Sequence, residues 1–241
     1  MTGYVFVLLT GLAAGTLSGV VGTGASILLL PVLIYQFGPQ PAVAIMAIAA
    51  VFLNVGKATS WWRQVQWRAF AAYAALGVPG AVLGARTLLI LPPGAVETVI
   101  GAFFLTMIPL RRWMRARDFR IRLWQLSLAG GGIGFLSGIA LSTGPLSIPA
   151  FLAAGLNLGA LLSTEAVASL ALMAAKVATF QRMGALPPDL VVQGLIVGAA
   201  SMAGTYMGKW VVTRMSLKAF DSALDVMLLC SGLSLLWAAL T

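Results

Sequence analysis

Two lysines lie inside apolar runs that are long enough to cross a membrane. Lys57 and Lys176 each stand six residues before an arginine, Arg63 and Arg182. A lysine within a membrane span costs at least ~2.5 kcal/mol on insertion scales, so it normally has a partner or a function. A buried ammonium can attract an anion, or it can extend its long stem to the membrane surface, and both interpretations stay open here. Asn54, one turn before Lys57 on the same helix face, is a candidate hydrogen-bonding neighbour.

Two stretches of small residues interrupt the apolar runs and predict breaks in membrane helices. A helix broken at membrane depth leaves backbone N–H groups that protein, water or a ligand must satisfy. The N-terminus of the next helix carries about +0.5 elementary charge and binds anions, and serine and threonine hydroxyls add donors. Two such breaks, one in each half of the chain, predict an anion site at the membrane midplane; the alternative is that the small residues only let helices pack closely. The candidate substrate-binding positions are Gly22, Thr23, Gly24, Ala25, Ser26, Asn54, Lys57, Ser142, Thr143, Gly144, Pro145 and Lys176.

Two further features have a more ordinary interpretation. Glu165 is an acid in the first turns of a predicted span. It can carry a coupling proton or pair with a basic residue, but we prefer the interpretation that it favours the helix N-terminus near Leu161 through the helix dipole. The spacings Gly80–Gly84 and Gly204–Gly208 predict close helix packing.

The composition places these residues in a membrane protein. The chain has 241 residues, of which 60% are hydrophobic and only 9% are charged, whereas a soluble domain has about 25% charged residues. It contains no histidine and one cysteine, so a Cys/His metal site and serine–histidine or cysteine–histidine catalysis are excluded. We therefore expect a protein that is not an enzyme and has no metal and no cofactor.

The net charge of +9 is concentrated in one segment, because six of the eleven arginines lie between Arg111 and Arg122. Such a block beside membrane spans is typical of a cytoplasmic loop, and it can contact anionic lipid headgroups. This distribution argues against a nucleic-acid partner.

The remaining chain consists of runs of mostly apolar residues, and a helix needs about 20 such residues to span a bilayer. The runs are Tyr4–Phe37, Pro41–Trp61, Phe70–Leu91, Val96–Leu110, Leu123–Leu156, Leu161–Phe180, Leu190–Val212 and Ala219–Leu240.

The two halves of the chain repeat each other. Gly15–Val20 recurs as Gly134–Ile139, each copy continues through small residues to a proline, and the two lysines occupy equivalent places. This organisation predicts a first membrane repeat at 1–110, a basic cytoplasmic linker at 111–122 and a second repeat at 123–241. The predicted fold class is an all-α polytopic membrane protein with two homologous repeats, each with a broken or re-entrant first element plus three spans.

The orientation of the repeats depends on the first element of each half. At about 34 residues it is too long for one untilted span and too short for two, which suggests two half-helices that meet in mid-membrane. If it re-enters, each half crosses three times and the halves are inverted; if it crosses fully, the halves are parallel. Inversion places Lys209, Arg214 and Lys218 on the cytoplasmic side, so the basic residues favour inverted repeats.

The pattern resembles a known family of membrane proteins. Ser18–Pro31, its second copy Ser137–Pro149, and Leu83–Arg86 are similar to the TauE/SafE sulfite-exporter family, and the resemblance covers essentially the whole chain. The stretch Gly22–Ser26 carries less glycine than is usual in that family, and the second copy carries less still. The single cysteine, Cys230, disfavours a branch that relays sulfur through several cysteines.

The resemblance implies a transmembrane transporter of small sulfur-containing anions, such as sulfite or the organosulfonate sulfoacetate. We expect an exporter that works by alternating access, as a multi-pass protein of the cell inner membrane in contact with membrane lipid. A small-anion channel and a non-transporting membrane scaffold are the alternatives. The sequence leaves the oligomeric state open.

Overall fold

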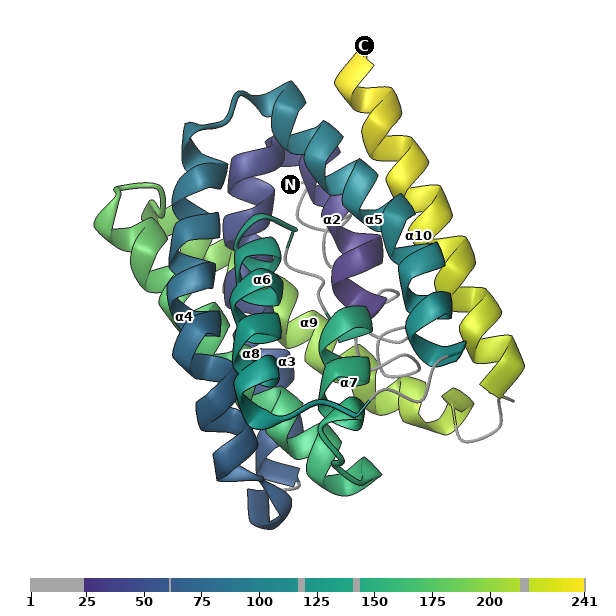
Figure 1. The fold of residues 1–241 in the computed structure, drawn as a ribbon. Helices are drawn as coiled ribbons and strands as arrows, with labels where there is room; N and C mark the ends of the chain where they lie inside the picture. The colour runs from purple at the N-terminus through teal and green to yellow at the C-terminus, as the bar shows by residue number, and fades with distance from the viewer. Residues whose placement is uncertain (1–23, 61, 117–119, 141–143, 213–216, 241) are drawn as a thin grey trace.

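The computed structural model describes residues 24–60, 62–116, 120–140, 144–212 and 217–240, at some of them by the backbone alone. Every regular element within these residues is a helix, which confirms the all-α class. The helices, labelled as in Figure 1, are α2 (Gly24–Phe37), α3 (Pro39–Ser60), the short 3-10 helix η1 (Trp62–Gln64), α4 (Trp67–Ile90), α5 (Pro93–Ala116), α6 (Leu123–Ala140), α7 (Gly144–Ala153), α8 (Leu158–Arg182), α9 (Pro188–Val212) and α10 (Leu217–Leu240).

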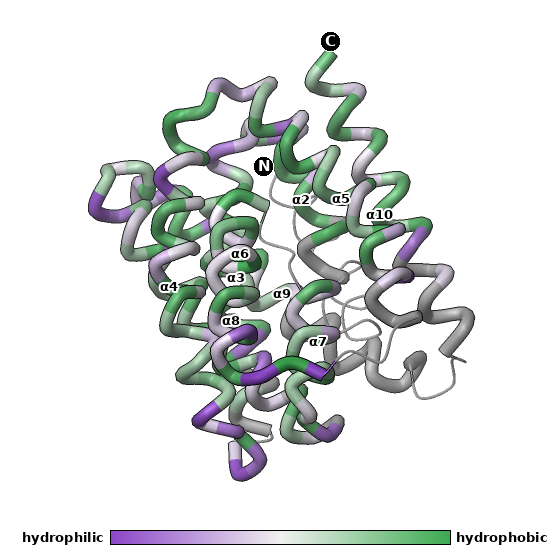
Figure 2. The backbone as a smooth tube through the Cα atoms, in the orientation of Figure 1, coloured by the Kyte–Doolittle hydropathy of each residue, from purple (hydrophilic) through white to green (hydrophobic). Residues whose placement is uncertain are grey.

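Four described helical segments are long and apolar enough to cross a membrane. They lie in α4, α5, α6 and α8, at Trp67–Ile90, Pro93–Leu110, Leu123–Ala140 and Gly159–Arg182. Hydrophilic positions gather in the connections and at the helix ends, and the helix middles are hydrophobic (Figure 2). The chain is therefore a multi-pass membrane protein, as its composition predicts.

Proline and glycine set two of the helix boundaries. Gly38 has a φ of 82°, a conformation that glycine adopts without a steric penalty, and α3 begins at the following proline, Pro39. Gly184 has a φ of 70° and lies between α8 and α9. The predicted basic linker is partly helical, because α5 continues to Ala116.

Helices α6 and α7 form a hairpin whose two ends lie at the same end of the molecule (Figure 1). The backbone N–H of Ile121, just before α6, donates to the carbonyl of Ala153 at the end of α7, with an N···O distance of 2.9 Å. At 1.5 Å per residue, α7 is about 15 Å long and α6 about 27 Å. The prediction of two half-helices is therefore wrong for α6, which is long enough to cross alone; only α7 is short.

Glycines hold α6 against α4. A Cβ atom at Gly134 would lie 2.8 Å from the Cα of Gly77, and one at Gly84 would lie 2.9 Å from the Cα of Gly138. These distances are shorter than real Cβ contacts, so the two backbones approach closely only because side chains are missing. The packing interpretation of Gly80–Gly84 is confirmed, since a Cβ atom at Gly80 would lie 3.0 Å from the backbone nitrogen of Phe135.

Helices α5 and α10 lie side by side and form a separate pair (Figure 1). Arg112 Nη2 and Asp225 Oδ2, 2.6 Å apart, join them in an ion pair. Helix α2 contacts both α10 and α3, while α7 contacts α5, α6 and α8. The two short helices α2 and α7 therefore lie between the α5–α10 pair and the other helices.

A serine of α10 completes the hydrogen bonding of α2. Pro31 lies inside α2 and has no N–H, so the carbonyl of Ile27 lacks its partner within the helix. The hydroxyl of Ser231 donates to that carbonyl at 2.9 Å. This contact ties α2 to α10 across 204 residues of sequence.

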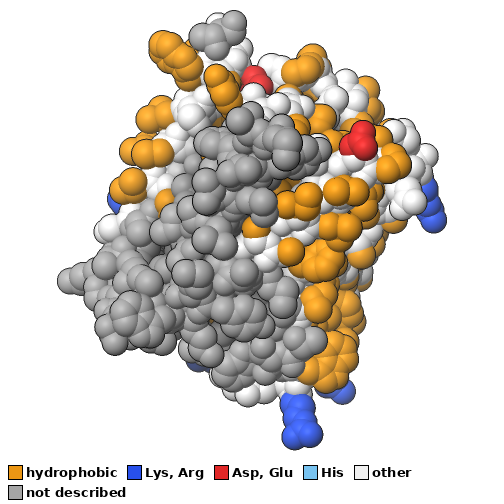
Figure 3. Space-filling view, turned by 180° about the vertical axis from the view of Figure 1, so that it is seen from behind, with side chains coloured by type: hydrophobic (Ala, Val, Ile, Leu, Met, Phe, Trp, Pro, Cys, Tyr) orange, Lys and Arg blue, Asp and Glu red, His pale blue; other side chains and the backbone are white. Residues whose placement is uncertain are grey.

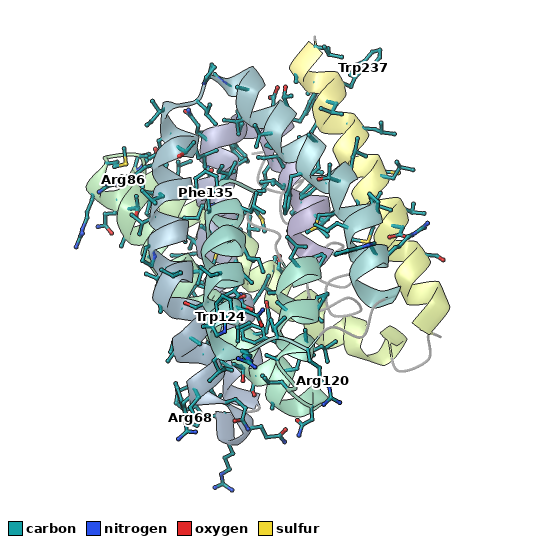
Figure 4. All side chains as sticks on the ribbon, in the orientation of Figure 1. Arg68, Arg86, Arg120, Trp124, Phe135 and Trp237 are labelled. Carbon is teal, nitrogen blue, oxygen red and sulfur yellow. The ribbon has the colours of Figure 1, made fainter. Side chains whose placement is uncertain are left out.

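The two ends of the molecule differ in the side chains they carry. Arg68 and Arg120 lie at one end, and Trp237 near the end of α10 lies at the other (Figure 4). Seen from behind, hydrophobic side chains cover the described flank, and Lys or Arg side chains project from its lower end and edges (Figure 3). This distribution suits a helical body in lipid with charged ends in water.

Candidate functional site

Lys176 caps the end of α6 from inside the protein. Its side chain is fully buried, and Nζ donates to the carbonyl oxygen of Ser137 at 2.9 Å. Ser137 lies in the last turn of α6, where carbonyl groups have no helical N–H partner because the helix ends at Ala140. An ammonium at a helix C-terminus also meets the negative end of the helix dipole. The lysine thus stabilises the end of α6 inside the protein.

The position of Lys176 shows that one of the two interpretations is wrong, namely that the lysine extends its stem to the membrane surface (snorkels). A snorkelling lysine holds its charge in water, whereas Lys176 has no exposed surface. Its Nζ lies 5.6 Å from the centroid of the Phe180 ring, within the range of a cation–π contact. Within the described part of the chain, no carboxylate pairs with it. The ammonium has three N–H donors, and among the described residues the carbonyl of Ser137 accepts from it.

Ser137 adds an unused hydroxyl next to the capped carbonyl. Its Oγ is buried and has no hydrogen-bond partner among the described residues. A buried hydroxyl without a partner costs roughly 1–3 kcal/mol, so such a group calls for an explanation. Ser137 and Lys176 therefore place an O–H and an ammonium together at the end of α6, a combination suited to an anion with several oxygen acceptors.

Comparison with known proteins identifies the family of the chain. The family profile described as Sulfite exporter TauE/SafE matches residues 7–235. The chain belongs to this family. Searches of curated proteins and of solved structures gave no match. The TauE/SafE resemblance seen in the sequence is confirmed, and the family is one of membrane transporters.

In this TauE/SafE chain, part of the predicted Gly-rich site lies within helices. Gly144 and Pro145 are buried and begin α7. The sequence predicts that the two helix breaks extend over Gly22–Ser26 and Ser142–Pro145. This is wrong for Gly144 and Pro145, and for Gly24–Ser26, which form the first turn of α2. The side chains of Gly24–Ser26 are not described. The physical reason is that a first turn tolerates proline and glycine, because its N–H groups need no helical partner. Those N–H groups remain candidates for anion binding. Gly22, Thr23, Ser142 and Thr143 lie outside the described residues.

The predicted pairing of Asn54 with Lys57 stays a prediction. Asn54 Nδ2 donates to the carbonyl of Ala50, one turn earlier in α3, at 2.9 Å. Lys57 lies in α3, but its side chain is not among those that the structure describes. The side chain of Lys176 is therefore placed, at the end of α6, whereas the side chain of Lys57 is not.

The dipole interpretation of Glu165 is wrong. Helix α8 begins at Leu158, capped by Asn157, whose side chain accepts from the N–H of Ala160. Glu165 therefore lies about two turns into α8, beyond the first turn in which the dipole acts. The helix starts earlier than expected because the Asn157 cap lies before the apolar run on which the expectation rested.

The sequence missed the partners that surround Glu165. Its Oε1 accepts from the hydroxyl of Ser169 at 2.8 Å, in the same helix, and from the hydroxyl of Ser147 of α7 at 3.3 Å. Glu165 is buried. The four-residue spacing of Glu165 and Ser169 is a signal that helical periodicity offers, whereas nothing in the sequence points from Glu165 to Ser147.

Proposed function

We propose that this TauE/SafE protein exports a small sulfur-containing anion, sulfite or an organosulfonate such as sulfoacetate, across the cell inner membrane. The observation that carries the proposal is the fully buried ammonium of Lys176 at the end of α6, next to the Ser137 hydroxyl, which has no partner among the described residues. An intramembrane charge that no described carboxylate neutralises is expensive to keep and marks a pathway for an ion. Family membership supports a sulfur anion as that ion.

The chemistry of the two groups fits an oxyanion. Sulfite and sulfonates carry negative charge spread over three oxygens, each of which accepts hydrogen bonds. An ammonium donates in several directions and is a compact charge, and a serine hydroxyl adds a neutral donor. The first turn of α7 has N–H groups without a partner in their own helix, and these are a further set of donors for the same anion. No covalent step is required.

We infer that the two halves are inverted repeats, an arrangement that supports alternating access. We infer that α2, α3, α4 and α5 correspond to α7, α8, α9 and α10. Each of these helices runs in the opposite direction to its counterpart (Figure 1). The contacts also exchange under this correspondence: α3 packs on α9 where α4 packs on α8, and α2 packs on α10 where α7 packs on α5. Two inverted halves around a site have two equivalent arrangements, one open to each side.

The test is ligand binding followed by flux, with the purified full chain. We expect sulfite or sulfoacetate to raise the thermal unfolding temperature, because a ligand bound only to the folded state adds about 2.7 kcal/mol at 100 times its Kd. Thiosulfate, taurine and chloride serve as comparisons. In proteoliposomes, sulfite or sulfoacetate is expected to move and to be concentrated against its own gradient. Stabilisation by chloride alone with purely downhill flux would favour a channel, and neither stabilisation nor flux would favour a scaffold and sink the proposal.

A further inference from the structure

The surroundings of Glu165 contain hydroxyl groups but no described cation. Its carboxylate accepts from Ser147 of α7 and Ser169 of α8, and the side chain is 6% exposed. Within the described part of the chain, no lysine or arginine pairs with it. An acidic side chain inside a membrane protein is costly to keep, and it usually pairs with another group or lies on a pathway for ions or protons. Glu165 is therefore a buried acid for which the described residues supply hydroxyl donors and no cation.

The elements packed against α8 carry few other titratable groups. Helices α6 and α7 contain none, α4 contributes Tyr73, which is buried and within electrostatic range of Glu165, and α3 contributes Lys57. Arg63 of η1 is exposed, as are Arg68 and Arg86 of α4. On α8 itself, Lys176 lies on the same face, eleven residues or about 16 Å further along the helix.

Packing does not require an acid at this place. The repeat spacing that pairs Lys57 with Lys176 also pairs Glu165 with Met46 of α3. Met46 is fully buried, so the corresponding place in the other half of the fold holds an apolar side chain. The carboxylate is present in one half only, which points to a role that acts once per molecule.

We propose that Glu165 binds a proton together with each transported anion, so that the protein is a proton–anion symporter. The inference rests on the function proposed above. The proton comes from water on the loading side, forms an O–H bond with the Glu165 carboxylate, and returns to water on the other side when the anion leaves. No electron moves and no other bond changes.

The coupling follows from the position of Ser147. This residue lies in α7 three residues after Gly144, so it connects Glu165 to the helix whose N-terminal N–H groups are candidate anion donors. An ionised Glu165 and an anion at that helix end repel one another, whereas a protonated Glu165 does not. Anion and proton therefore favour each other's binding. A dianion carried with one proton still bears a net negative charge, and the inside-negative membrane potential drives it outward.

The test uses sulfoacetate in proteoliposomes with a pH-sensitive dye, near neutral pH, where its sulfonate and carboxylate stay ionised. In the native protein, sulfoacetate flux is expected to carry protons in the same direction, and a proton gradient is expected to concentrate it. Glu165→Gln mimics the protonated acid. We expect it to abolish proton movement and to reduce gradient-driven accumulation at least tenfold, while sulfoacetate still stabilises the protein and exchanges one-for-one across the membrane.

Asp189→Asn, at an exposed acid of α9, is the matched control and should leave both readouts unchanged. Proton movement that persists in Glu165→Gln would overturn the inference, as would accumulation that requires sodium ions and ignores the proton gradient. Lys57→Gln tests the alternative that Glu165 forms a permanent ion pair with Lys57. In that case the Glu165→Gln/Lys57→Gln double variant should recover thermal stability, and both single variants should keep proton coupling. This outcome would also overturn the inference. Absence of sulfoacetate binding and flux in the native protein would instead reject the proposed function and this inference with it.

Discussion

The ammonium of Lys176 donates to the backbone carbonyl of Ser137, which lies 39 residues earlier in the sequence and 2.9 Å away. We infer two duties for the lysine, because it caps α6 and its amino group has no carboxylate partner within the described region. A lysine that served only as a cap would bond the carbonyl in the same way with and without bound substrate. The two duties are separable by experiment, since capping affects stability and the charge affects anion affinity.

Removal of the lysine charge is expected to weaken anion binding. Losing a charge-assisted contact costs about 1.5–3 kcal/mol, so Lys176→Gln should lower the affinity for sulfite or sulfoacetate roughly tenfold or more. Glutamine retains donors and much of the length. Thermal-shift titration measures the affinity, and Arg182→Gln, at the exposed end of the same helix, is the control. Unchanged affinity in the Lys57→Gln/Lys176→Gln double variant would falsify the charge contribution and leave the helix-end N–H groups as the candidate site.

Ser137→Ala separates a structural role of the hydroxyl from a binding role, because we expect it to affect protein stability and anion affinity differently. Without ligand, removal of an unpartnered buried hydroxyl should leave the stability unchanged or raise it, because the cost of its desolvation disappears. If the hydroxyl binds the anion, affinity should fall by about 0.5–1.5 kcal/mol, or roughly two- to tenfold. Unfolding is measured with and without sulfoacetate. Ser163→Ala is the control, since that hydroxyl donates to its own helix backbone, and equal affinity in both variants would speak against Ser137.

Close packing of α6 on α4 predicts different effects for two neighbouring glycines. Gly134→Ala places a methyl group against the backbone of Gly77 and should destabilise the protein by about 1–3 kcal/mol or more. Gly132→Ala meets nothing within 4 Å and should be neutral or slightly stabilising, because alanine favours helix by roughly 0.5–1 kcal/mol. Thermal unfolding in detergent compares them. Similar stability of the two variants would contradict the close approach of α4 and α6.

The contact of Ser231 with α2 predicts a suppressor pair. Ser231→Ala leaves the Ile27 carbonyl without a partner and should cost about 1–3 kcal/mol. Pro31→Ala supplies the missing N–H within α2, so the double variant Ser231→Ala/Pro31→Ala should recover part of that loss. Ser234→Ala is the control, because its hydroxyl donates within α10. Additive losses in the double variant would show that the proline does not create the need for the serine.

Accessible-cysteine labelling tests the orientation in the membrane. In a Cys230→Ser background, Arg120→Cys should react only from the cytoplasmic side and Trp237→Cys only from the opposite side, because these residues lie at opposite ends and the basic end faces the cytoplasm. Both chain termini are expected on the side of Trp237. Reaction of both cysteines from one side would exclude this topology.

The sequence alone determined which segments are helices in a membrane and where most of them turn. Composition, apolar run length, Gly38 and the prolines are local properties, and local properties decide whether a segment crosses lipid. The sequence also marked Lys176 as an unusual residue, since a charge in an apolar run is visible without a structure. The family follows from the same residues.

Only the tertiary structure decided what those residues touch. Ser137 meets Lys176 and Ser147 meets Glu165 across helices that are apolar on most faces. In lipid, hydrophobicity does not single out the face that packs, so helical periodicity cannot tell which helices pair or at what height. The glycine contacts of α4 and α6 fix that register by permitting close approach of the backbones. Which buried polar groups meet one another is settled by this packing, because each contact joins residues that the sequence holds apart.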